Sequence, residues 1–377
     1  MQSRRLLLLL NDAAFFVSHR LPVALAAQAA GYDVHVATAP GTGVSKIVDS
    51  GLTHHAIPVS RSGTSVLGEL HTVVRVWQLF KCLNPDIVHC VTIKPVLYGG
   101  LVARLTGVPT LVAAVSGMGF VFLEEGIVAR ARRALVRVLY RLSLRHGRAT
   151  IIFQNPDDQR QLLELIGPDA ARAVLIRGSG VDLAQYPSVA RIAGSRPTVV
   201  MASRLLTDKG VREYVAAART LRAAGSNAIF RLAGTVDPNP ASITVAEVEH
   251  WRAEGVVEVL GFQKDVASLF ADSDIVVLPS YREGMPKVLL EAAACGRAVV
   301  TTDVPGCRDA IEPDVTGILV PARDAKALAA AIATLVGDPA MCRRMGAAGR
   351  ALAERSFTIE SVIASHLRVY RDAAVVA

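Results

Sequence analysis

The chain has 377 residues, about twice a typical domain length, so two domains are the default expectation. Its five cysteines form no C-x-x-C pair, which argues for a reducing compartment and against a disulfide framework or a zinc site. The net charge of +8 is uneven: residues 1–185 hold 19 Lys and Arg against 12 Asp and Glu, a balance of +7. We therefore expect an anionic partner to meet the N-terminal half.

Short apolar strands alternate with helical stretches along the first half of the chain. The apolar run 6–10 follows two arginines but stops at Asn11-Asp12, which is too short for a membrane span, so we interpret it as a buried first strand. Further strands are predicted at 33–38, 86–92, 110–115 and 149–155. Helices are predicted at 20–30 and 68–82.

The same alternation resumes after a composition shift at residues 186–196, which we interpret as a linker. Strands are predicted at 197–203, 228–234, 256–261, 274–280 and 298–303, and closing helices at 324–336, 339–354 and 358–374. Strands that are apolar on both faces and joined through helices indicate parallel sheets. The expected fold class is α/β, with two Rossmann-like doubly wound domains, 1–185 and 197–357, facing a ligand-binding cleft, and with residues 358–377 packed back on the first domain.

The segment "SYREGMPKVLLEAAACG" carries two glutamates, Glu283 and Glu291, eight positions apart in an otherwise apolar run. Because Pro286 suits the first turn of a helix, Glu283 and Gly284 are predicted to lie in a strand-to-helix loop and Glu291 inside the helix. Glu291 has apolar neighbours, which disfavours a solvated position. The amides at the start of this helix suit phosphate or sugar oxygens, and they belong to Met285, Lys287 and Val288.

A second segment, "ASRLLTDKG", follows the first strand of the second domain and places Arg204 and Lys209 at a strand's carboxyl end. Arginine and lysine are the usual pair for a diphosphate. Both segments belong to one predicted sheet, so two cations and two carboxylates should converge into a nucleotide-sugar site. The structural alternatives are plain surface charges for Arg204 and Lys209, and a helix N-terminal role worth about 0.3–1 kcal/mol for Glu283.

These motifs resemble a known family. "SRLLTDKG" followed by "SYREGMPKVLLEA" is similar to the retaining glycosyltransferases of family GT4, which have the GT-B architecture. The segments "FFVSHRLPVALAAQAAGYDVHVAT" and "DIVHCVTIKPVLYGGLVAR" are similar to a subgroup that acts in bacterial surface-polysaccharide assembly. "VLGFQKDV" and "VPGCRDAIEPDVTGILVPARD" extend the resemblance over nearly the whole chain.

The resemblance implies a role for each donor-site residue. Glu283 would contact the donor sugar near its reacting carbon, Glu291 would hold the ribose, and Arg204 with Lys209 would neutralise the diphosphate. Backbone groups near Gly261–Phe262 would hold the base. The implied reaction transfers a sugar, by our interpretation an N-acetylhexosamine, from a UDP-sugar to a polyprenyl-diphosphate-linked saccharide, with retention and without a metal or other cofactor. A GDP-sugar donor and a nucleotide-sugar epimerase of related fold are the alternatives.

A row of arginines marks the segment 124–148, and no acidic residue lies between Gly126 and Pro156. On a helix these arginines fall within about 60° of one line. They are Arg130, Arg133, Arg137, Arg141, Arg145 and Arg148. Such a helix fits docking on an anionic membrane, which predicts a cytoplasmic protein held peripherally at the inner face of the cell membrane. A plain exposed face is the alternative, and nucleic-acid binding is disfavoured because only Tyr140 interleaves the row.

The acceptor side carries a weaker signal. Many GT4 enzymes have a histidine after the strand predicted at 110–115, but this chain has Ser116 and Gly117 there. The candidates for acceptor binding, chosen by their position at strand ends or in loops, are His19, Arg20, His89 and Lys94. Of these, Lys94 and Arg20 would suit an acceptor diphosphate, whereas His89 is favoured as a core histidine. The "DSD" at 272–274 is interpreted as the start of a strand, so no metal site is expected.

Overall fold

The computed structural model describes residues 3–59, 66–117, 127–167, 171–189, 196–237 and 239–375, and the chain forms two compact units. Unit 1 comprises residues 1–179 and 360–377, and unit 2 comprises residues 180–359. The chain therefore divides earlier than the predicted boundary at residue 185, since the Val181 amide donates to the carbonyl of Phe357 in unit 2. The predicted linker 186–196 belongs to unit 2, and its residues 190–195 lie outside the described part.

Unit 1 contains a parallel seven-stranded sheet in the order β3-β2-β1-β4-β5-β6-β7. Its strands are β1 Arg5–Leu9, β2 Asp33–Thr38, β3 Thr53–Ala56, β4 Ile87–Val91, β5 Thr110–Val115, β6 Ala149–Phe153 and β7 Arg172–Leu175. Its helices are α1 Ala13–His19, α2 Leu21–Ala29, α3 Val44–Asp49, α4 Val66–Leu83, α5 Ile93–Thr106, α6 Ile127–Leu144, α7 Pro156–Ile166 and α14 Ile359–Val375.

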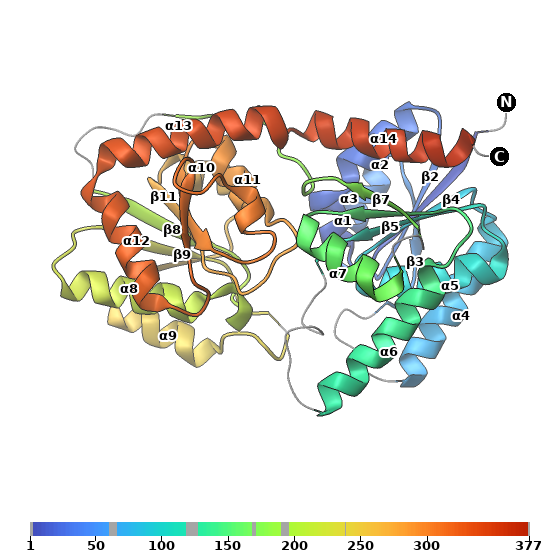
Figure 1. The fold of residues 1–377 in the computed structure, drawn as a ribbon, viewed down its shortest axis with the longest axis horizontal. Coiled ribbons are helices and arrows are strands. Elements are labelled where there is room, and N and C mark those ends of the chain that lie inside the picture. Colours follow the sequence, from blue (N-terminus) through green and yellow to red (C-terminus); the bar gives the residue numbers. More distant parts are fainter. Residues whose placement is uncertain are drawn as a thin grey trace. The chain divides into compact units, whose positions relative to one another are not determined.

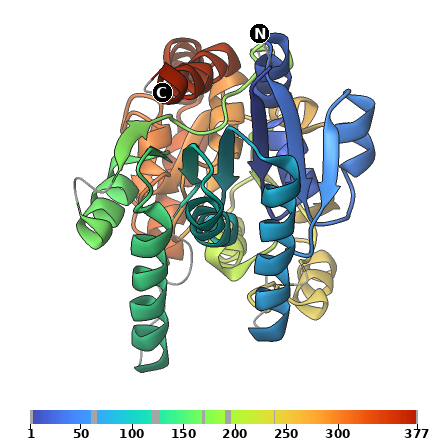
Figure 2. The same ribbon diagram turned by 90° about the vertical axis from the view of Figure 1, so that its right-hand side faces the viewer.

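Helices cover both faces of this sheet (Figure 1). Leu7 and Leu9 of β1 pack in one apolar cluster with residues of α4, α5, α6 and α7. The alternate residues Leu6 and Leu8 pack in a second cluster with α1, α2, α3 and α14. Alternation along a strand thus explains why the N-terminal run of leucines is apolar throughout: both of its faces are buried. In Figure 2 the long helices α4 and α6 stand on either side of α5, which is seen nearly end-on and packs against both.

Unit 2 contains a parallel six-stranded sheet in the order β10-β9-β8-β11-β12-β13. Its strands are β8 Thr198–Ala202, β9 Ile229–Ala233, β10 Glu258–Gly261, β11 Ile275–Leu278, β12 Ala298–Thr302 and β13 Gly317–Val320. Its helices are α8 Val211–Ala223, α9 Val245–Glu254, α10 Val266–Ala271, α11 Lys287–Ala294, α12 Ala325–Gly337 and α13 Pro339–Ser356, with 3-10 turns η2 Thr207–Lys209 and η3 Arg308–Ala310. The expected α/β class with two doubly wound units is confirmed.

Three strands were not predicted from the sequence, namely β3, β7 and β13. Each is four residues long and lies at an edge of its sheet. The sequence of β3, THHA, has no apolar run, and the apolar runs of β7 and β13 are shorter than those that identified the central strands. The predicted helix 20–30 is confirmed as α2, which begins at Leu21 with Pro22 in its first turn, whereas α1, Ala13–His19, was not predicted.

Among the described helices, none is by itself both long and apolar enough to cross a bilayer. Helices α12 and α13 reach that length and hydropathy only as a pair, and the pair is bent by 101°. Both contribute buried residues such as Ile332 and Met345 to the core of unit 2.

A cluster of polar side chains is buried in unit 1, where α14 packs on the sheet. His89 of β4 shares a hydrogen bond of 2.7 Å with the hydroxyl of Tyr370, and the ring of His366 lies 5.7 Å from that of His89. Arg20 belongs to the same cluster and is 1% exposed. Burial, with a smaller contribution from the positive charge of Arg20, lowers the pKa of His366 to about 3.

We predict that acidification destabilises unit 1 through this cluster. An unfolded chain protonates His366 near its ordinary pKa of 6.5, whereas the folded chain keeps it neutral down to about pH 3. The free energy of unfolding should therefore fall as pH drops through this window, by about 2 kcal/mol at about pH 5 for this residue. Thermal unfolding at about pH 7 and about pH 5 measures the effect. His366→Gln should reduce the difference, and His71→Gln, at an exposed position on α4, should not; equal pH dependence in both variants and the wild type contradicts the prediction.

Candidate functional site

Two loops at the carboxyl ends of neighbouring parallel strands build the candidate donor site in unit 2. Strand β8 leads into η2, and β11 leads into the loop before α11. Because β8 and β11 pair directly, their loops emerge side by side. The Nζ of Lys209 donates to Oε1 of Glu283, and both side chains are mostly buried, with 14% and 13% exposed. The structure thus brings together the ammonium and the carboxylate that the sequence placed in separate motifs.

The backbone holds these two loops against each other. The Tyr281 amide donates to the carbonyl of Asp208 over 2.8 Å. Gly210 follows Lys209 with φ of 72°, and a Cβ there would lie 2.1 Å from the carbonyl oxygen of Pro279. Gly306 supports the other side, since its Cβ would lie 2.6 Å from the carbonyl oxygens of Glu283 and Gly284. Only glycine fits such close backbone approaches at positive φ.

Glu283 is fixed by more than Lys209. The hydroxyl of Ser280 donates to the same carboxylate oxygen, Oε1, over 2.7 Å. The backbone amide of Glu283 donates to the carbonyl of Pro305 over 3.1 Å. Glu283 therefore has a defined orientation before any ligand enters.

Glu291 lies in α11 and is 8% exposed, as its apolar neighbours predicted. The hydroxyl of Tyr186 donates to Oε1 of Glu291 over 2.7 Å, and Nζ of Lys287 lies 3.3 Å from the same oxygen. Burial, followed by the charge of Glu291, raises the pKa of Tyr186, which keeps its hydroxyl protonated as a donor. The sequence analysis did not identify Tyr186, because it lies 105 residues away in the chain.

Arg204 lies two residues beyond β8 and keeps 40% of its side chain exposed. Its Nη1 lies 3.2 Å from Oδ2 of Asp237, a partner that the sequence analysis also missed. Each predicted cation of the site is thus matched with a carboxylate.

Asp208 is a further carboxylate of the site that was not predicted. Its Oδ1 is buried and has no hydrogen-bond partner among the described residues. Burial raises the pKa of Asp208 above its ordinary value; the negative charge of Glu283 adds to this, while Lys209 opposes it. The charge state of Asp208 is thus coupled to those of Lys209 and Glu283 beside it.

The remaining predicted donor residues occupy the start of α11 and the end of β10. The helix begins at Lys287, followed by Val288, and Pro286 is the capping residue before it rather than part of the first turn, which corrects the predicted position. The Leu289 amide donates to the carbonyl of Pro286 over 3.0 Å, and Met285 is buried. Gly261 ends β10 with φ of 69°, and the next residue, Phe262, is 75% exposed.

The acceptor candidates in unit 1 fall into two groups. Arg20 and His89 are buried, so neither side chain reaches an acceptor in this structure, and His89 is a core histidine. His19 is partly exposed at the end of α1, where its Nδ1 lies 2.6 Å from the Ser18 hydroxyl and its ring stacks on Phe15. Lys94 lies in the first turn of α5 and pairs with Glu69 of α4. The expectation that Arg20 holds an acceptor diphosphate is therefore corrected by its burial.

Among the described residues, no three His, Cys, Asp or Glu side chains are grouped so that they could hold a metal ion. Asp274, the residue of the "DSD" that precedes β11, accepts a hydrogen bond of 2.8 Å from the Thr198 amide. Its carboxylate thus helps to join β8 to β11, which is a structural role.

Known proteins resemble both units. Residues 5–155 match the family described as glycosyl transferase 4-like, and residues 184–352 match the family described as glycosyl transferases group 1. A relative from Campylobacter jejuni is 28% identical over 375 residues, covering 96% of this chain and 97% of that protein. It is named N,N'-diacetylbacillosaminyl-diphospho-undecaprenol alpha-1,3-N-acetylgalactosaminyltransferase.

Two solved structures share the fold. A sucrose-phosphate synthase from Thermosynechococcus elongatus has a TM-score of 0.82 at 20% identity, covering 99% of this chain and 100% of that one. HepE of Anabaena in complex with UDP has a TM-score of 0.77 at 17% identity, covering 98% of this chain and 100% of that one. The two-unit architecture is that of GT-B proteins.

We predict that Gly210→Ala disrupts the donor site. A Cβ at this position meets the Pro279 carbonyl, so the β8 and β11 loops must separate. Gly225 is a matched control: it also has positive φ, but no atom lies within 4 Å of its Cβ position. Gly225→Ala should lower the free energy of unfolding by about 1 kcal/mol, and Gly210→Ala by about 1–3 kcal/mol more. Chemical denaturation measures both, and equal losses in the two variants disprove the steric explanation.

Proposed function

We propose a donor, an acceptor and a reaction course for this chain, which belongs to the glycosyltransferases. The proposed reaction transfers an N-acetylhexosamine from a UDP-sugar to a polyprenyl-diphosphate-linked saccharide, with retention at the anomeric carbon. The observation that carries the proposal is the contact of Lys209 with Glu283 at the ends of two paired strands. Glu291 lies in α11, the helix that follows the Glu283 loop. HepE in complex with UDP, and the C. jejuni relative's name, support the donor nucleotide and the kind of sugar.

Binding of the donor exchanges the partners of the site's ion pairs. Lys209 and Lys287 now pair with Glu283 and Glu291, and Arg204 pairs with Asp237. A diphosphate supplies these cations with phosphate oxygens, which form strong charge-assisted hydrogen bonds. The carboxylates are then released to accept hydrogen bonds from hydroxyls, Glu283 from the sugar and Glu291 from the ribose. The exposed Phe262 and the backbone of Gly261 lie at the end of the same sheet and would hold the base.

The chemical step requires stabilisation of the leaving group. A bond forms between the acceptor oxygen and the anomeric carbon while the bond from that carbon to the β-phosphate oxygen breaks. Negative charge develops on the diphosphate, where Arg204 and Lys209 stabilise it. The acceptor's proton passes to the departing phosphate on the same face of the sugar, so the course needs no carboxylate nucleophile and no metal ion.

The acceptor and the cellular location follow from the same relative and from α6. The C. jejuni protein's name specifies a saccharide linked through a diphosphate to undecaprenol. A lipid carrier of this kind requires contact with a membrane, and we place the protein in the cytoplasm, peripherally at the inner face of the cell membrane. Helix α6 supplies basic residues for this contact, and beside them its Leu135, Val138 and Leu142 are exposed.

We predict that Lys209→Ala and Glu283→Ala each lower the rate of sugar transfer by about 100-fold or more, because each removes a group that acts at the breaking bond. The measurement is transfer to a polyprenyl-diphosphate acceptor from a panel of UDP-, GDP- and ADP-sugars. Lys326→Ala, which removes an exposed lysine of α12, is the control and should transfer at the wild-type rate. Wild-type activity in Lys209→Ala, with its melting temperature unchanged, rules out the proposed site.

We further predict that replacing Arg137, Arg141 and Arg145 together by Gln weakens binding to anionic vesicles. Each arginine near an anionic surface contributes about 1 kcal/mol, so the affinity should fall by about 100-fold. Co-sedimentation with phosphatidylglycerol vesicles measures it. A triple replacement of exposed arginines in unit 2, at Arg222, Arg343 and Arg344, removes the same charge and should bind as the wild type does. Equal losses in both triple variants mean that net charge, and not α6, governs binding.

A further inference from the structure

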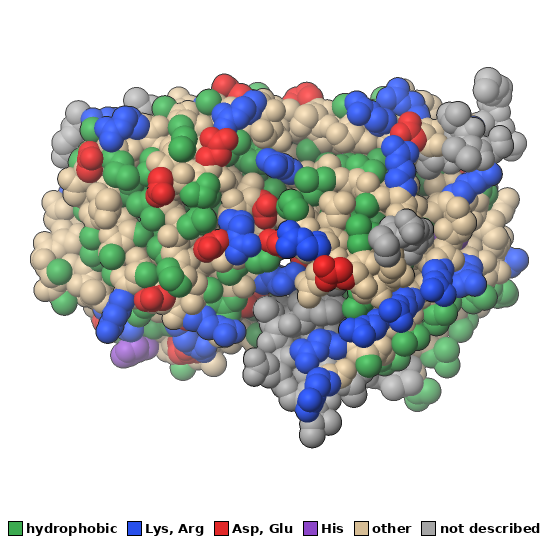
Figure 3. All heavy atoms as spheres, in the orientation of Figure 1, with side chains coloured by type: hydrophobic (Ala, Val, Ile, Leu, Met, Phe, Trp, Pro, Cys, Tyr) green, Lys and Arg blue, Asp and Glu red, His purple; other side chains and the backbone are tan. Residues whose placement is uncertain are grey.

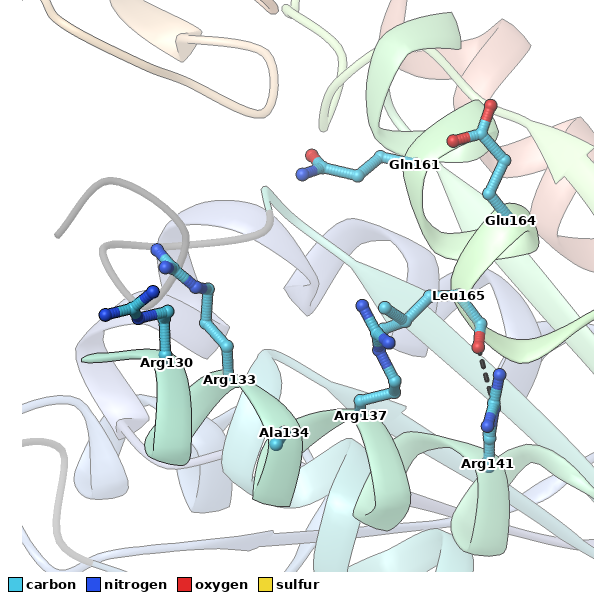
Figure 4. A pocket seen from close by; sticks show the side chains of 8 residues that line it. All are labelled: Arg130, Arg133, Ala134, Arg137, Arg141, Gln161, Glu164 and Leu165. Carbon is cyan, nitrogen blue, oxygen red and sulfur yellow. Dashed lines mark hydrogen bonds between the residues drawn. The ribbon is translucent and has the colours of Figure 1, made fainter. Parts of the chain in front are cut away.

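A groove lies in unit 1 between α6 and α7, with a volume of about 480 Å³. Four arginines of α6 line it together with two polar residues of α7, Gln161 and Glu164. Figure 4 shows Arg130, Arg133, Arg137 and Arg141 rising from one side of α6, while Gln161 extends from α7 over the same space. The groove is thus a concave basic site and not a flat basic surface.

Packing on the opposite side of α6 fixes the direction of this row. Tyr140 and Leu144 are buried in the core of unit 1, so the helix cannot rotate about its axis without losing apolar contacts. At the far end, Nε of Arg141 donates to the carbonyl of Leu165 over 2.8 Å and joins α6 to α7. The arginines are therefore held toward α7.

The groove and the exposed apolar residues of α6 occupy different faces of the helix. Leu135, Val138 and Leu142 are 59%, 50% and 42% exposed, and they do not line the groove. In Figure 3 a row of basic side chains follows α6, with hydrophobic side chains beside it. The groove therefore presents its arginines on a face of α6 that the exposed apolar residues do not occupy.

Most charged side chains that line the groove are basic. Among its lining residues four guanidinium groups oppose one carboxylate, that of Glu164, which in Figure 4 is turned away from the arginines. Like charges three or four positions apart on a helix repel each other. An anion between them removes this repulsion. Each guanidinium also presents parallel donors that match two phosphate oxygens.

We propose that this groove binds a diphosphate group. From Arg130 to Arg137 the row extends over about 10 Å of helix, which accommodates two adjacent phosphates. Arg130, Arg133 and Arg137 would bind the phosphate oxygens, and the Gln161 amide would donate a further hydrogen bond. The source of the diphosphate rests on the proposed function, in which it links the acceptor saccharide to its polyprenyl chain. This site is separate from the donor-diphosphate site, which lies in unit 2.

The test measures binding of inorganic pyrophosphate by calorimetry to the full chain carrying Lys209→Ala, which weakens the donor site. Adding Arg133→Gln with Arg137→Gln should weaken pyrophosphate binding by at least about tenfold. Arg104→Gln with Arg160→Gln removes the same charge from α5 and α7 outside the groove, and should leave the affinity unchanged. An equal loss in both pairs, or no loss in either, overturns the proposal.

A second arm identifies the source of the diphosphate. Neutral phosphatidylcholine vesicles with and without a polyprenyl diphosphate are compared with phosphatidylglycerol vesicles. Arg133→Gln with Arg137→Gln should weaken binding to the polyprenyl diphosphate vesicles more than binding to phosphatidylglycerol, where each arginine acts only through its general charge. Equal loss on both overturns diphosphate recognition and makes the row part of a general membrane surface. The proposed donor site is tested separately. Wild-type sugar transfer by Lys209→Ala contradicts the donor site, whatever the groove binds.

Discussion

The pairing of β8 with β11 is the constraint on which the candidate donor site depends. Parallel neighbours end at the same edge of a sheet, so Lys209 and Glu283, 74 residues apart, are placed in contact without any feature of their own loops requiring it. Gly210 and Gly306 then allow backbones to approach more closely than any side chain permits. The carboxylate of Asp274, which accepts from the Thr198 amide, fastens the opposite ends of the same two strands. Structural and functional residues of unit 2 thus share one pair of strands.

The site without its ligand already satisfies most of its charges internally. Lys209, Lys287 and Arg204 each pair with a carboxylate. Partners of this kind keep the side chains extended and ordered, which lowers the entropic cost when a diphosphate replaces the carboxylates. Asp208 is the exception, because its Oδ1 is buried without a hydrogen bond among the described residues.

The sequence predicted the central strands and the convergence of the donor motifs because both leave local signals. Buried parallel strands are apolar runs, and the burial of Glu291 was predicted from its neighbours. Short edge strands were missed, for example β3, whose sequence THHA carries no apolar run. Long-range partners were missed as well: Tyr186 and Asp237 bond to site residues that are distant in the sequence, and no pattern near either residue indicates this. The interior position of Arg20 was missed because arginine is rarely buried without a carboxylate partner.

The return of the chain to unit 1 has a consequence for biosynthesis. Unit 2 is inserted between residues 179 and 360 of unit 1, and α14 supplies Val362, Val369 and Tyr370 to the core around β1 and β4. On the ribosome the first seven strands emerge well before this helix, so the part of the sheet that α14 covers stays exposed while the whole of unit 2 is translated, although α1, α2 and α3 already cover the rest of that face. A nascent chain of this design exposes apolar surface around β1 and β4 until α14 is synthesised, and transiently exposed surface of this kind favours aggregation.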